Sequence, residues 1–435
     1  MPVVAGAAGI MLLLFSYYAR TWQSLAAVVD VCPNQFCDFL DYYYPMGETI
    51  FSTGLPVPGF LYSAFNAILL AVFPPLGQDA SLIIWGLLQV LSVSLYVLLF
   101  RRLVPAGLSI QLLFVVLTLS SYPALLNLMA GQVSVFMIVA LLGMLVLYER
   151  GRRATAAGLL AFAVSFKFYP IIFLAPFGAR RDTRLLLFGV GACGAFLFVI
   201  PGVLLGGGDM LQFYGALFDS FRDSGWVVTN PHSQFFPHVF LRLAGAAGHD
   251  ANAYHWLLRW VAHGVAAANV GLLFLVQRAR LRHADLWSFQ LLFLTTPFVL
   301  KTSWPHDFVF LSFSQALLAW RLLEEEGMVP GTETAGKRPH TRARRERTPR
   351  AAVAVTSFLL LVSIVFSNIV FFNLVGGFFN YGFLAFLFWA NLLLLIAFYV
   401  VLLPPALQHF RVRGRCADRS TSAAPGAPAA EARGR

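Results

Sequence analysis

Long apolar runs dominate this 435-residue chain and limit what it can fold into. A helix needs about 20 residues to cross the roughly 30 Å hydrocarbon core of a bilayer. Hydrophobic residues make up 59% of the chain and charged residues only 12%, about half of their share in soluble domains. We therefore expect an all-α polytopic membrane protein of about ten to twelve transmembrane helices. The apolar runs lie near 3–19, 81–100, 107–126, 133–148, 185–205, 255–276, 285–300, 307–322, 352–373 and 381–402.

The basic residues lie mostly in short loops between these runs, and this gives the chain an orientation. Cytoplasmic loops are enriched in Lys and Arg, and most acidic residues of this chain lie in the intervening loops. The net charge of +11 therefore reflects topology, and we expect no nucleic-acid partner. The first run lacks a basic start and an A-x-A-like cleavage site, so it is expected to remain as the first span. The pattern predicts two cytoplasmic termini, with basic loops at 101–102, 149–153, 179–184, 277–283, 324–350 and 411–435.

Two segments do not fit simple crossings. Residues 154–178 separate two basic loops by only about 25 residues, whereas two crossings need roughly 40. We interpret this segment as a short or re-entrant helical hairpin with Lys167 near its apex, which is tolerated where it lines a protein cavity. Residues 60–76 must stay on the outer side and are interpreted as interfacial or partly re-entrant.

The segment CPNQFCDFLDYYYP is polar and acidic, directly after the first apolar run. A positioned carboxylate there would suit the general base of a glycosyl transfer; the alternative is that Asp38 or Asp41 only caps an exposed helix. Asp41 rivals Asp38, because residues three apart share one face of an α-helix. Cys32 and Cys37 lie on the exported side, where a disulfide can form; two free thiols are the alternative.

Further polar groups lie at the outer ends of later spans. Trp304 and His306 follow Lys301 closely, and they either anchor the chain at the interface or bind an anion or hydroxyl. Arg259 lies in the outer half of a span and either snorkels to the interface or binds a phosphate.

Cofactor motifs are absent from the sequence. His232 and His238 lack the spacing of a helical metal site, and no P-loop or dinucleotide-binding motif occurs in a suitable setting. We expect no cofactor and no metal site, with a divalent cation as an open alternative.

The order of these features resembles the polytopic polyprenol-phosphate-mannose-dependent glycosyltransferases of the GT-C superfamily, most closely glycosyltransferase family 87. The family's Asp-Phe-x-x-Tyr-Tyr motif matches DFLDYY, with the aspartate at Asp38. Its Tyr-Pro-Pro segment and Trp-bearing helix match FLYSAFNAILLAVFPPLGQDASLIIW, with Ser63 and Ala64 where prolines are usual. Its Gly-Gln, Lys-x-x-Pro and Trp-x-His motifs match Gly131–Gln132, Lys167–Pro170 and Trp304–His306.

The resemblance implies a GT-C-type fold and an inverting transfer of a hexose, with mannose expected, from a polyprenyl-phosphate donor. The acceptor would be lipid- or glycan-linked, on the extracytoplasmic face of the plasma membrane, and membrane lipids would surround the enzyme. Asp38 would be the general base. The substrate-binding candidates are His306, Lys167, Gln132, Trp304, Asp41 and Arg259, with Lys167, Gln132 and Arg259 near the lipid-linked phosphate.

A transporter or flippase for a lipid-linked or small-molecule substrate is the alternative function. Many transporters contain internal repeats and interrupted helices with charges at the membrane midplane. We find no repeat, and the polar groups of this chain lie at the outer rim.

The resemblance also suggests how the chain is divided. We expect a transmembrane GT-C catalytic module at 1–323, with a helical first external loop at 20–80 and a second external loop at 206–254. A disordered cytoplasmic loop at 324–350 would join it to C-terminal transmembrane helices at 351–403. A basic, disordered cytoplasmic tail would follow at 404–435.

Overall fold

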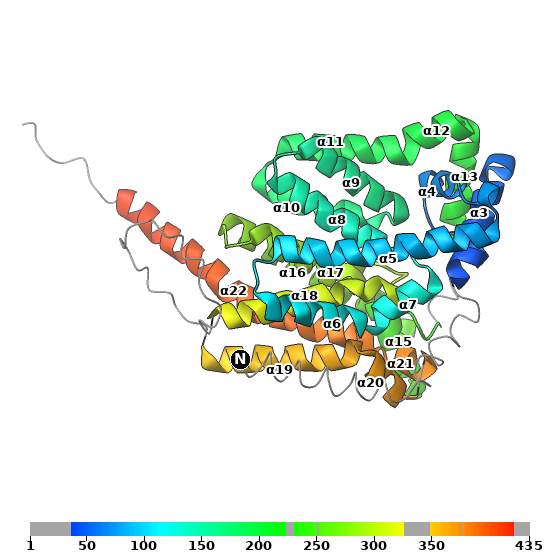
Figure 1. The fold of residues 1–435 in the computed structure, drawn as a ribbon. Coiled ribbons are helices and arrows are strands. Elements are labelled where there is room, and N and C mark those ends of the chain that lie inside the picture. The colour runs from blue at the N-terminus through cyan, green and yellow to red at the C-terminus, as the bar shows by residue number, and fades with distance from the viewer. Residues whose placement is uncertain (1–35, 223–229, 250–251, 326–348, 377, 422–435) are drawn as a thin grey trace, which may run out of the picture.

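The computed structural model describes residues 36–222, 230–249, 252–325, 349–376 and 378–421 and is built from helices (Figure 1). Those residues contain no β-strand. The all-α polytopic fold is therefore confirmed. The first half contains η1 Phe39–Tyr43, α3 Tyr44–Thr53, α4 Ala64–Leu70, η2 Pro74–Leu76, α5 Gln78–Leu103, α6 Leu108–Leu119, α7 Tyr122–Ala130, α8 Ser134–Glu149, α9 Arg153–Phe166, η3 Tyr169–Leu174, α10 Ala175–Arg180, α11 Thr183–Gly194, η4 Ala195–Val199, α12 Ile200–Leu205 and α13 Gly207–Arg222.

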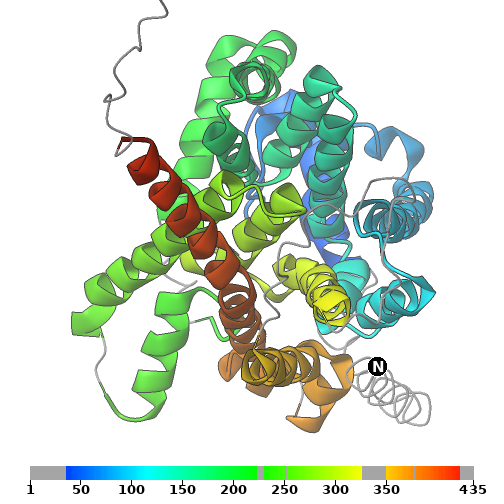
Figure 2. The same cartoon turned by 90° about the vertical axis from the view of Figure 1, so that its left-hand side faces the viewer.

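In the second half, the other helices surround α17 and α18, which are buried along most of their length. Nearly every residue of α17 is buried, which is typical of a helix that is apolar all round. Figure 2 shows α18 (yellow) beside α6, α19 and α22. The helices are α15 Phe236–Ala246, η5 Asn252–Tyr254, α16 His255–Arg278, α17 Ala284–Val299, η6 Pro305–Val309, α18 Phe310–Glu325, α19 Arg350–Ser367, α20 Ile369–Leu374, α21 Phe378–Phe383 and α22 Phe386–Thr421.

Five helical segments of the described chain are long and apolar enough to cross a membrane. A sixth is the pair α7 and α8, if this pair, bent by 114°, is one broken span. Other predicted runs form shorter helices, because turns interrupt them; the run at 107–126, for example, is divided between α6 and α7. The run at 3–19 lies outside the described residues. The five segments are Gln78–Leu103, Thr183–Leu205, His255–Ala279, Arg350–Ser367 and Phe386–Gln408.

The segment at 154–178 forms a helical hairpin, as predicted. Helix α9 ends at Phe166, the Lys167 backbone is extended (φ −144°, ψ 135°), and the chain returns through η3 and α10. At the base of the hairpin, the Arg153 guanidinium pairs with the Asp182 carboxylate at 3.0 Å. Lys167 therefore lies at the opposite end, at the break in the hairpin.

The segment predicted to form the first external loop is helical in its described part, as predicted, and packs on the N-terminal half of α5. Phe39 of η1 stacks on Trp85 of α5, with ring centroids 4.7 Å apart. Ser63 begins α4: its hydroxyl accepts from the Asn66 N–H and donates to the Ser165 carbonyl at 2.7 Å. The serine at a position where prolines are usual thus joins α4 to the end of α9.

The C-terminal helices pack against the rest of the bundle, with α19 and α22 side by side (Figure 1). The predicted disordered tail at 404–435 differs from the structure, in which α22 continues to Thr421. A helix already formed in a span extends without a new nucleation step, which explains the difference. Residues 326–348 and 422–435 lie outside the described residues.

Candidate functional site

A cavity of about 600 Å³ brings together residues from four separate segments. Asp38 precedes η1, Gln132 lies between α7 and α8, Lys167 lies at the hairpin break, and Trp304 and His306 lie at the start of η6. All five were predicted as site residues. The cavity therefore joins motifs that are more than 250 residues apart in sequence.

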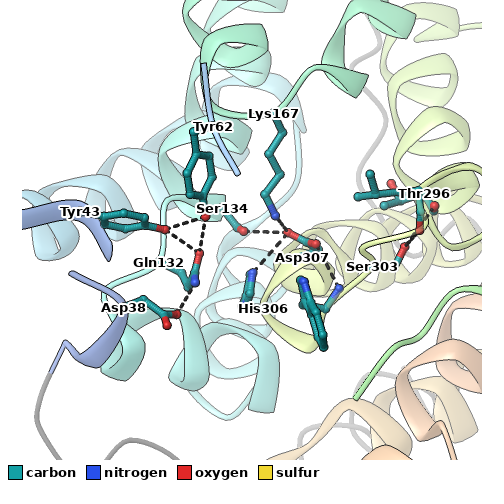
Figure 3. A network of polar contacts seen from close by, with 12 residues as sticks. Asp38, Tyr43, Tyr62, Gln132, Ser134, Lys167, Thr296, Ser303, His306 and Asp307 are labelled. Carbon is teal, nitrogen blue, oxygen red and sulfur yellow. Dashed lines mark hydrogen bonds and ion pairs between the residues drawn. The ribbon is translucent and has the colours of Figure 1, made fainter. Parts of the chain in front are cut away.

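Gln132 holds Asp38 at one side of this cavity (Figure 3). Its side-chain amide nitrogen donates to Asp38 Oδ2. Its amide oxygen accepts from the Tyr43 hydroxyl at 2.9 Å and from the Tyr62 hydroxyl at 3.1 Å. Because two phenols occupy the oxygen, the NH₂ group is directed to the carboxylate.

A glycine turn places Gln132 in the cavity. Gly131 ends α7 in the left-handed conformation (φ 71°), and a Cβ there would lie 2.9 Å from Trp85 Nε1. The same indole N–H donates to the Gly131 carbonyl at 2.9 Å. Gln89 donates to the Gln132 carbonyl at 2.8 Å. The Gly-Gln motif is thus a backbone turn fixed by α5.

Burial determines the protonation behaviour of Asp38. Desolvation raises its pKa to about 6, opposed mainly by the hydrogen bond from Gln132, while Asp41 raises it further and Lys167 lowers it. A carboxylate with a pKa close to neutrality is well suited to general-base catalysis.

The second half of the site is centred on Asp307, which is fully buried. Asp307 Oδ1 forms an ion pair with the Lys167 ammonium and accepts from the Ser134 hydroxyl at 3.0 Å. Its other oxygen accepts from the Trp304 backbone N–H at 3.2 Å. Burial alone would raise the pKa of Asp307, but the charge of Lys167, together with His306 and the hydrogen bonds from Lys167 and the Trp304 backbone, outweighs burial and lowers the pKa. This carboxylate is stabilised as an anion and joins three segments.

His306 is a neutral partner in the cavity. Its Nε2 lies 3.7 Å from Asp307 Oδ1, too far for a hydrogen bond. Burial lowers the pKa of His306 to about 3, although Asp307 acts in the opposite direction. A neutral imidazole offers one donor and one acceptor, which suits a sugar hydroxyl or a phosphate oxygen.

Two predicted residues do not line the cavity. Asp41 is exposed, because η1 is a π-helix, whose wider turn does not place residues three apart on one face. Arg259 is exposed near the start of α16. Cys37 is disulfide-bonded and lines the cavity, but Cys32 lies outside the described residues, so their pairing stays a prediction. No group of three or more His, Cys, Asp or Glu residues in the described chain could hold a metal.

The sequence did not identify several residues that the structure brings to the site. Asp307 directly follows His306 in the sequence, but nothing local marks it as the partner of Lys167. Ser134 follows the Gly-Gln motif by two residues. Tyr43 belongs to a conspicuous tyrosine run, and only the fold shows that its hydroxyl meets Gln132.

One comparison with known proteins identifies a family for this chain. The model of glycosyltransferase family 87 matches residues 60–303, just over half of the chain. The match includes Gln132 and Lys167, whereas Asp38 precedes it and His306 follows it. Neither the curated proteins nor the solved structures contain a match to this chain. The chain belongs to glycosyltransferase family 87, a family of GT-C-type membrane glycosyltransferases.

Proposed function

We propose that this membrane glycosyltransferase moves a hexose, specifically mannose, from a polyprenyl-phosphate donor to a lipid- or glycan-linked acceptor. The observation that carries the proposal is the position of Asp38 in one cavity with Lys167 and His306. One carboxylate with a raised pKa and a separate cationic group match the two needs of such a transfer. The choice of mannose rests on the motif resemblance.

The proposed step is a single displacement. The acceptor hydroxyl oxygen attacks the anomeric carbon and forms the new glycosidic bond, while its proton passes to the Asp38 carboxylate. The bond from the anomeric carbon to the phosphate oxygen breaks, and its electron pair stays on that oxygen. Configuration is inverted, so no second carboxylate is needed as nucleophile.

Lys167 and His306 are proposed to stabilise the departing phosphate. The Lys167 ammonium lines the cavity while one of its contacts goes to Asp307, and an ammonium has three donors in all. His306 is neutral at physiological pH and can donate one hydrogen bond. Donors already oriented toward developing charge are an effective source of catalysis.

The reaction is proposed to occur on the extracytoplasmic face of the plasma membrane. The cavity lies between the predicted external segment, the hairpin apex and η6, whereas the Arg-rich loops connect the opposite helix ends. Membrane lipids would supply the donor and surround the enzyme. No cofactor is part of this proposal.

The test compares Asp38→Asn with Asp41→Asn in membranes supplied with radiolabelled polyprenyl-phosphate mannose. General-base catalysis contributes roughly 10²–10⁴-fold, so we expect a loss of that size for Asp38→Asn. Asp41→Asn is the matched control, because Asp41 is exposed and lies outside the cavity lining. Full transfer activity of Asp38→Asn would show that Asp38 is not the general base. A wild-type protein that carries substrate across vesicles without transferring sugar would support the transporter alternative.

A further inference from the structure

The loop at 230–235 forms a part of the cavity wall that has no role in the proposed displacement. Asn230 and His232 line the cavity. Burial, together with Arg242, lowers the pKa of His232 to about 4. The imidazole is therefore neutral, and with the Asn230 carboxamide it offers hydrogen bonds without charge. Both groups can donate and accept hydrogen bonds, as sugar hydroxyls do.

Arg242 of α15 fixes this loop against the C-terminal helices. Its Nη1 donates to the carbonyls of Asn230 and Ser233, both at 3.1 Å. Its Nε and Nη2 donate to the carbonyls of Phe383 and Gly382, both at 3.0 Å. One planar guanidinium thus connects the cavity wall to α21 with four hydrogen bonds.

Gln234 makes a second connection. Its backbone N–H donates to the Ser303 carbonyl at 2.8 Å, directly before Trp304. Its side-chain oxygen accepts from the Phe388 N–H at 3.2 Å. The loop is therefore held between the start of η6 and the first turn of α22.

Gly382 is packed directly against the cavity-lining histidine. A Cβ at this position would lie 2.5 Å from His232 Nδ1 and 3.0 Å from the Pro231 carbonyl oxygen. Any side chain at 382 would therefore displace His232 or the loop. Gly382 lies outside the range 60–303 that the family model matches.

We propose that His232 is a substrate-contacting residue that binds a sugar hydroxyl in the cavity, and that Gly382 and Arg242 are positioning residues that hold it there. This inference rests on the proposed glycosyl transfer. It gives the C-terminal helices a part in completing the cavity wall. The sugar belongs either to the donor or to the acceptor, and kinetics with each substrate distinguish the two.

The test is a double-mutant cycle of Gly382→Ala and His232→Ala, with KM and kcat measured for donor and acceptor. We expect each single variant to lower kcat/KM about tenfold, within the range for lost contacts between neighbours. Gly382→Ala should have less than about a twofold effect once His232 is Ala, because the 2.5 Å clash with the imidazole is gone and the 3.0 Å approach to the Pro231 carbonyl oxygen remains. KM should rise mainly for the substrate whose sugar contacts His232, and His232→Asn should recover part of the loss.

Gly191→Ala is the matched control, since a Cβ at this exposed helical glycine meets nothing within 4 Å. Equal penalties of Gly382→Ala in both backgrounds would disprove the positioning role. Unchanged kcat/KM for both substrates in His232→Ala would disprove the sugar contact. Thermal unfolding in detergent separates both results from loss of folding.

A wild-type protein without transfer would instead disprove the proposed function. The inference is then tested without turnover, by thiol labelling of His232→Cys after subtraction of wild-type labelling. Protection of this cysteine by polyprenyl-phosphate mannose or by a free mannoside would support a sugar-contacting position. Unchanged labelling would overturn it.

Discussion

Two aspartates in the same cavity region have opposite environments. Asp38 is partly buried, and one side-chain amide is its hydrogen-bonded partner in the described chain. Asp307 is fully buried and surrounded by an ammonium, a hydroxyl and a backbone N–H. Burial raises the pKa of Asp38 to about 6, whereas the partners of Asp307 overcome burial and lower its pKa.

The difference shows how one side-chain type can serve two purposes. A carboxylate with few partners can gain a proton near neutral pH, as a general base must. A carboxylate with several donors stays ionised and acts as a fixed counter-charge for Lys167. The nearby charge of Lys167 and the hydrogen bonds to Asp307, rather than burial alone, separate the two.

Removal of the Asp307 carboxylate should have the largest effect on stability. Asp307→Ala leaves the Lys167 ammonium without its partner, and breaking a buried pair costs about 3–5 kcal/mol. The double variant Lys167→Met with Asp307→Leu should recover most of this loss, because no buried charge remains. Unfolding in detergent measures both variants, with the exposed Asp41→Ala as control. A double variant as unstable as Asp307→Ala would contradict the pairing.

The pH dependence of stability should distinguish the two aspartates. The pKa of Asp38 rises from 3.8 to about 6 on folding, so its ionisation destabilises the fold as pH rises through this window. Asp38→Asn should therefore gain up to about 3 kcal/mol relative to wild type between pH 4 and pH 7. Asp307, whose pKa is lowered, contributes stability above its ordinary pKa that is lost as pH falls. Parallel pH curves for wild type and Asp38→Asn would refute the raised pKa.

Variants of the Asp38 partners should give the smallest effects. The hydrogen bond from Gln132 lowers the pKa of Asp38, so Gln132→Ala should move the acid limb of the kcat/KM profile to higher pH. Tyr43→Phe should change transfer by less than about tenfold, because Tyr62 still donates to the Gln132 oxygen. The pH–rate profiles of both variants test this order. A larger shift of the acid limb for Tyr43→Phe than for Gln132→Ala would contradict the direct contact of Gln132 with Asp38 as the main effect.

Hydropathy and loop charge in the sequence predicted the helical membrane fold, because spans and basic loops are local properties. Residue counting also predicted the hairpin with Lys167 at its break, since the segment is too short for two crossings. The motif order selected Asp38, Gln132, Lys167, Trp304 and His306, all of which line the cavity.

Only the tertiary structure decided which polar groups meet. Asp41 and Arg259 satisfied the same local criteria as the lining residues but lie outside the cavity, and a π-helical turn explains the position of Asp41. The partnership of Lys167 with Asp307 joins residues 140 positions apart. The approach of Gly382 to His232 joins a C-terminal helix to the loop at 230–235. Such contacts depend on how helices pack, and helix packing is not a property of any local stretch of sequence.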